Sequence, residues 1–165
     1  MDIIFTVIRE DTFWKILLSV HFMLALILLA ALTLQVVTAL MPARQVAGGF
    51  VDRGPIPAAS YATLVAIVYL LQALMGAWIY VKYRTYVRIP MEELRYWWTV
   101  GGFDFKEHTV AMGVGLLPAY WYFWQQPAST ERAGVRKWLT VFLTLGVWYA
   151  LSIGHVANYF RGVGS

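Results

Sequence analysis

The chain has 165 residues, of which 60% are hydrophobic and only 13% are charged, and its mean hydropathy is +0.61. Soluble domains are typically about 45–50% apolar and about 25% charged, so this composition indicates an integral membrane protein. The chain has no cysteine, which excludes disulfide scaffolds, thiolate metal sites and iron–sulfur clusters. The net charge of +4 comes from short segments between apolar blocks, with no RNA-binding signature, and therefore does not predict nucleic-acid binding.

Four apolar stretches predict membrane-spanning helices, at about 16–40, 61–81, 108–124 and 138–160. A spanning helix needs about 20 mostly apolar residues, and long uninterrupted apolar runs lack the alternation of a membrane β-barrel. The fold class predicted for residues 1–165 is therefore an all-α, four-helix transmembrane bundle forming a single domain.

The connecting segments predict the orientation, because Lys and Arg favour the cytoplasmic side of a membrane. The predicted inner side carries eight basic residues and the outer side carries five. We therefore expect both termini to face the cytoplasm of a multi-pass protein in a bacterial inner membrane.

The connection between the second and third stretches predicts a short helix on the inner membrane face. Pro90 followed by Glu92 and Glu93 is typical of a helix start, and the tryptophans that follow suit the lipid headgroup layer. We expect this helix at 91–98, with a turn at Gly101–Gly102, and a plain connecting loop is the alternative.

Two histidines lie at matching predicted depths on different helices. With the expected topology, His21 on the first helix and His155 on the fourth both lie about 8–9 Å inside the inner boundary, from the rise of about 1.5 Å per residue. Trp148, Ser152 and Tyr159 share a helix face with His155, and we expect that face to point inward. His108 opens the third helix and is expected at the membrane interface rather than as a ligand.

This pair of histidines suggests bis-histidine ligation of a haem, because neutral imidazole is a common axial ligand and a helical bundle can hold the macrocycle. Without cysteine the haem would be non-covalent haem b. The haem propionates would pair with cations near the inner surface, for which the candidates are Arg84, Arg88, Arg161 and Lys106.

His21, His155 and the number of helices resemble, in architecture, the small four-helix b-type cytochromes that anchor dehydrogenases. The resemblance implies a membrane electron-transfer subunit that passes electrons between a partner dehydrogenase and a quinone. The quinone is expected near the inner aromatic segment.

Other interpretations remain open at this point. Each histidine could instead hydrogen-bond within a haem-free accessory subunit of a larger membrane complex, and a three-histidine metal site is a further alternative. The sequence has no Walker, GxGxxG or GxSxG motif and no intramembrane carboxylate pair, so an enzymatic activity of its own stays undecided.

Overall fold

Long helices make up most of the protein in the computed structural model, which describes residues 10–41, 44–46, 49–51, 58–127 and 129–160. The elements follow one another as α2 (Glu10–Leu40), β1 (Arg44–Val46), β2 (Gly49–Val51), α3 (Ala58–Tyr83), the π-helical turn η1 (Arg84–Arg88), α4 (Ile89–Glu93), α5 (Trp97–Gln125) and α6 (Thr130–Phe160). This high helix content confirms the predicted all-α class.

The four predicted apolar stretches lie within α2, α3, α5 and α6, and each observed helix is longer than its apolar stretch. Glu10 and Asp11 occupy the first turn of α2, where their carboxylates face the positive end of the helix dipole. Among the described residues, β1 and β2 are two three-residue strands that pair antiparallel, with Gln45 opposite Phe50. These strands were not predicted from the sequence.

Within the described part of the chain, three helical segments are long and apolar enough to cross a membrane: Glu10–Leu40, Ala59–Glu93 and Thr130–Tyr159. Their outward faces carry large apolar side chains, such as Leu74 and Leu145, which are 68% and 64% exposed. These features are consistent with a multi-pass integral membrane protein surrounded by lipid. Helix α5 is not among the three.

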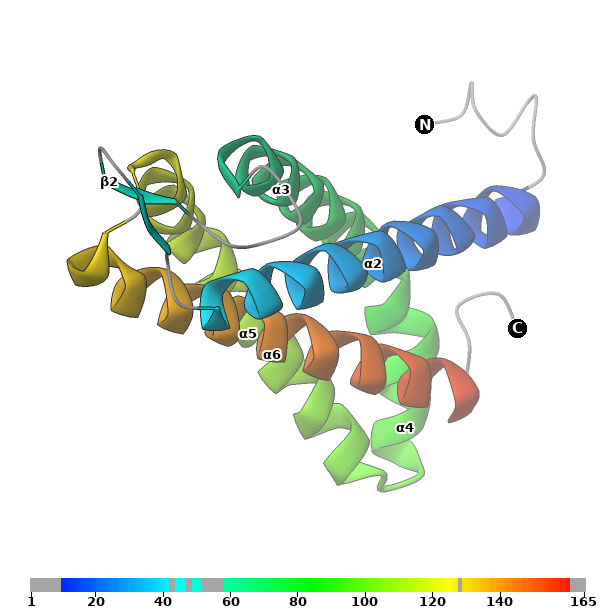
Figure 1. Cartoon of the computed structure of the whole chain (residues 1–165). Coiled ribbons are helices and arrows are strands. Elements are labelled where there is room, and N and C mark those ends of the chain that lie inside the picture. The colour runs from blue at the N-terminus through cyan, green and yellow to red at the C-terminus, as the bar shows by residue number, and fades with distance from the viewer. Residues whose placement is uncertain (1–9, 42–43, 47–48, 52–57, 128, 161–165) are drawn as a thin grey trace.

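The long helices pack in a closed cycle, in which α2 contacts α3 and α6, and α5 also contacts α3 and α6. The start of α2, the end of α6 and α4 lie at one end of the molecule, and the β1–β2 hairpin lies at the other (Figure 1). We call the first of these ends the α4 end.

The described residues form an interior with two clusters of buried side chains. The larger lies towards the hairpin and includes Leu32, Val65 and Tyr120. The smaller lies at the α4 end and includes Tyr83 and Phe103, whose rings stack with centroids 3.7 Å apart.

The connection between α3 and α5 differs from the predicted short helix and turn. The chain continues from α3 through η1 into α4, reverses at Leu94–Tyr96, and begins α5 at Trp97. Gly101 and Gly102 are therefore inside α5, and the expected turn at these glycines is wrong. The turn residue is Arg95, with a left-handed φ of 61°; Tyr96 N donates to the carbonyl of Met91 at 2.9 Å.

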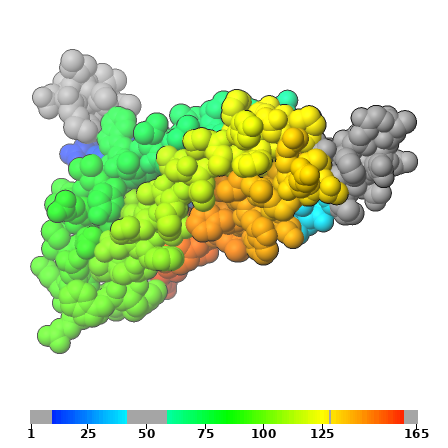
Figure 2. Space-filling model, turned by 90° about the vertical axis from the view of Figure 1, so that its left-hand side faces the viewer, coloured from blue at the N-terminus to red at the C-terminus, as the bar shows by residue number. Residues whose placement is uncertain are grey.

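This reversal is a Schellman motif, in which a residue of left-handed conformation ends a helix. The left-handed position of this motif is normally a glycine, which makes the motif recognisable in a sequence. Here the position is an arginine, so the sequence did not indicate the reversal. The junction of α4 and α5 projects at one corner of the molecule (Figure 2). Trp97 and Trp98 follow it and are 62% and 59% exposed.

Candidate functional site

A cavity of about 440 Å³ lies between the two clusters of the interior, and α2, α3, η1, α5 and α6 all contribute to its walls. Its volume falls within the range of about 300–1,000 Å³ that is usual for small-molecule sites. Most of the lining is apolar, with polar side chains at intervals. These are Ser19, His21, Tyr69, Gln72, Tyr80, Tyr83, Lys106, Glu107, His155 and Asn158.

His21 belongs to the α2 wall of this cavity and is held against α3. The side-chain amide of Gln72 donates to His21 Nε2 at 3.2 Å. Gly76, one turn further along α3, lets the imidazole approach closely, since a Cβ at that glycine would lie 3.3 Å from His21 Cε1. An imidazole whose Nε2 accepts a hydrogen bond is in the neutral form, which is the form that ligates a metal.

Two buried polar atoms of this pair, His21 Nδ1 and Gln72 Oε1, have no hydrogen-bond partner among the described residues. Buried polar groups are almost always paired, and an unpaired one costs about 1–3 kcal/mol. The His21–Gln72 pair is therefore incompletely satisfied by the protein itself, as expected for side chains that contact a ligand.

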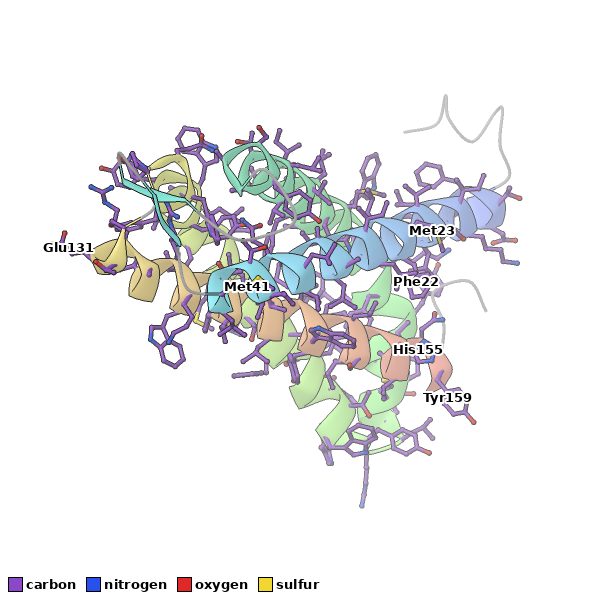
Figure 3. All side chains as sticks on the ribbon, viewed as in Figure 1. Phe22, Met23, Met41, Glu131, His155 and Tyr159 are labelled. Carbon is purple, nitrogen blue, oxygen red and sulfur yellow. The ribbon has the colours of Figure 1, made fainter. Side chains whose placement is uncertain are left out.

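His155 reaches the same cavity from α6. It lies near Phe22 of α2, and both side chains line the cavity and are exposed (Figure 3). The face of α6 that carries His155 was expected to point inward, but Trp148, Ser152 and Tyr159 on that face are exposed, so this expectation is wrong. The neighbouring face of α6, with Val147 and Gly154, lines the cavity instead, and His155 stands at its rim.

The two histidines lie at corresponding positions along α2 and α6. The hydroxyl of Thr144 donates to the carbonyl oxygen of Leu32 at 3.3 Å, which ties the two helices together at that level. His21 precedes Leu32 by eleven residues, and His155 follows Thr144 by eleven residues. With the same helical rise, both histidines are about 16 Å from this contact, each along its own helix.

His108 is placed differently from the other two histidines. Its side chain is exposed on α5, outside the cavity lining, and Nδ1 donates to the carbonyl of Asp104 at 2.7 Å. Among residues that the structure describes, no three His, Asp or Glu side chains come together in a group able to hold a metal ion. The structure therefore gives no support to a three-histidine metal site.

The arginines expected near the propionates lie outside the cavity lining or outside the described residues. Arg88 forms a bidentate pair with Asp104 at 2.9 and 3.1 Å, and its Nε donates to Glu92 at 2.8 Å. Arg84 is exposed and does not line the cavity, and Arg161 falls outside the described residues. The cation that does line the cavity is Lys106.

Sequence reasoning missed Gln72 and Tyr83 as site residues. Gln72 is the one strongly polar residue in the predicted span 61–81, and that was the available signal. Tyr83 carried no signal, since the aromatic residues of this chain are too frequent for one tyrosine to stand out.

Comparisons with known proteins give no further information about the chain. No protein-family model matches it, and no curated protein or solved structure is detectably similar. The proposed function therefore rests on the cavity and its residues.

Proposed function

We propose that this protein is a small membrane electron-transfer subunit, a b-type cytochrome that holds a non-covalent haem in the cavity between α2 and α6. The observation that carries the proposal is that His21 and His155, from opposite ends of the sequence, line one cavity at corresponding helix positions. Two imidazoles from different helices are the usual arrangement for low-spin haem in a helical bundle.

The residues of the cavity fit a haem group. His21 is neutral, and ligation through Nε2 would replace its hydrogen bond from Gln72. Gly76 and Gly154 keep the walls beside the two histidines free of side chains. Bound haem would supply one-electron transfer, and the apolar lining would keep water away from it.

The proposed membrane arrangement has four spans, with α5 crossing at about 108–124 and both termini in the cytoplasm of a bacterial inner membrane. In support of this, the four long helices pack in a closed cycle, so α5 lies beside two candidate spans. This arrangement puts the cavity in the inner leaflet, from which electrons would pass between a partner dehydrogenase and a quinone held near the α4–α5 junction.

The test is the haem content of the purified full-length protein after expression with adequate haem. We expect a pyridine haemochrome of protohaem in a ratio close to one per chain. Colourless protein of native fold would contradict the cytochrome and would support the alternative, a haem-free accessory subunit of a larger membrane complex. The exposed apolar faces would then be its contacts with other subunits.

A further inference from the structure

We propose that the cavity takes up its ligand sideways from the lipid bilayer, through an opening between α2 and α6. Ser19 and Phe22 of α2 and His155 and Asn158 of α6 form this opening, which we call the mouth of the cavity. The inference rests on the proposed function for the identity of the ligand, haem b. It restricts the ligand to molecules that dissolve in membranes.

The exposure of the lining residues shows where the cavity meets the molecular surface. Among the described residues that line it, the four mouth residues are exposed, whereas those contributed by α3, η1 and α5 are buried or half-buried. The cavity is therefore closed on the side of α3 and α5, and it opens between α2 and α6.

The mouth exists because α2 and α6 separate towards the α4 end. Trp148 Nε1 donates to Thr33 Oγ1 at 3.3 Å, which joins the two helices near their middle. From there the helices diverge, so the start of α2 and the end of α6 are well apart (Figure 1). Phe22 and His155 lie on the two sides of the resulting gap (Figure 3).

The surface beside the mouth is apolar and belongs to helices that are long and apolar enough to cross a membrane. Val20 and Met23, which adjoin mouth residues on α2, are 45% and 53% exposed, and both α2 and α6 are candidate spans. In a bilayer these side chains contact acyl chains, since apolar surface is favoured there over water. A molecule that enters between them comes from the lipid phase.

The route also brings an entering molecule to the two histidines in order. His155 stands at the mouth, and His21 lies further in, held against Gln72 of α3. Haem b is flat and largely apolar, so it meets the requirement for entry from lipid, whereas a nucleotide or a free amino acid does not.

The experiment uses single-cysteine variants of the full-length protein, purified from haem-depleted cells and reconstituted in lipid vesicles. Because the chain has no cysteine, one introduced thiol can be modified selectively with monobromobimane, an uncharged fluorescent reagent. The mouth variants are Phe22→Cys and Asn158→Cys. The matched controls are Met23→Cys and Tyr159→Cys, because each is exposed and adjoins a mouth residue but does not line the cavity.

Each modified variant is compared with the same variant unmodified, and the rate of protohaem uptake is measured by absorbance. We expect modification at position 22 or 158 to slow uptake roughly tenfold or more, and at position 23 or 159 less than about twofold, because only the first pair narrows the mouth. Equal slowing at all four positions, or no slowing at 22 and 158, would overturn the lateral route and leave the proposed function intact.

A second readout does not depend on haem. Bimane at position 22 in haem-free vesicles should be quenched by lipids brominated on their acyl chains and not by iodide in the water. Quenching by iodide alone would overturn the lateral route. Quenching by brominated lipids in a protein that binds no protohaem would support a mouth open to lipid and overturn the proposed function.

Discussion

The hydroxyl of Thr144 lies 3.3 Å from the carbonyl oxygen of Leu32, and this contact marks a level at which α6 lies against α2. The single O–H of Thr144 is shared between this carbonyl and the carbonyl of Thr140 in its own helix, which is 2.7 Å away. This contact is relevant to the candidate site because the alignment of α6 along α2 decides which of their residues lie at the same level. The level of interest is eleven residues from the contact along each helix. His21 and His155 are the residues at that distance.

The close approach of α3 and α5 predicts that Gly113→Ala destabilises the protein. A Cβ at Gly113 would overlap the Tyr69 hydroxyl oxygen, so the tyrosine or the helix must move. Overpacking of this kind costs about 1–3 kcal/mol. We expect a lower thermal unfolding midpoint in detergent.

Gly115→Ala is the control for this change, because a Cβ there meets no atom within 4 Å. It should leave the midpoint unchanged or raise it, since alanine favours the helix by up to about 1 kcal/mol. Equal effects of the two substitutions would show that the contact between Tyr69 and Gly113 is not tight.

The buried pair of Tyr120 and Gln35 predicts a second stability effect. Tyr120 donates to Gln35 Oε1 at 2.5 Å, both residues are fully buried, and Gln35 Nε2 has no partner in the part of the chain that the structure describes. Tyr120→Phe would leave the whole amide of Gln35 unpaired, at a cost of about 1–3 kcal/mol. Tyr122→Phe, at a residue that is 54% exposed, is the matched control and should change the unfolding midpoint little. An unchanged midpoint for Tyr120→Phe would contradict this role of the hydrogen bond.

The left-handed turn at Arg95 predicts a stabilising substitution. Its φ of 61° is unfavourable for a residue with a Cβ by about 1–2 kcal/mol, and glycine avoids that cost. We expect Arg95→Gly to raise the unfolding midpoint and Arg84→Gly, within η1, to lower it. A lower midpoint for Arg95→Gly would mean that its side chain stabilises the turn by more than the backbone strain costs.

The proposed four-span topology predicts the side on which reporter fusions are found. Fusions after Val51 and after Glu131 should report the outer side, and a fusion after Leu94 should report the cytoplasm. If the fusion after Glu131 reports the cytoplasm, α5 does not cross the membrane, and the proposed arrangement is wrong.

The sequence predicted the helical class and the positions of the long helices, because apolar runs of spanning length are a strong signal. It placed the α3–α5 reversal at Gly101–Gly102, and the actual turn uses Arg95, for which the usual glycine signal is missing. The β1–β2 hairpin was also missed, since a pair of three-residue strands carries too little alternation to be recognised.

The candidate site was predictable in part. Counting residues from the expected boundaries put His21 and His155 at the same level, and their shared cavity agrees with that count. Helix periodicity did not predict that His155 stands at the rim, because the exposed and cavity-lining faces of α6 adjoin one another. Arg88 could not be assigned from sequence, since its pairing with Asp104 depends on the reversal between α4 and α5.

The measurement that tests the central proposal most directly is the low-spin haem spectrum of histidine variants. We expect wild-type protein to show a low-spin b-type spectrum and His21→Ala and His155→Ala to lose it, because each removes one strong-field axial ligand. His108→Ala should keep the wild-type spectrum, since this residue lies outside the cavity lining. A low-spin spectrum that survives both His21→Ala and His155→Ala, or that disappears in His108→Ala alone, would contradict the proposed ligands.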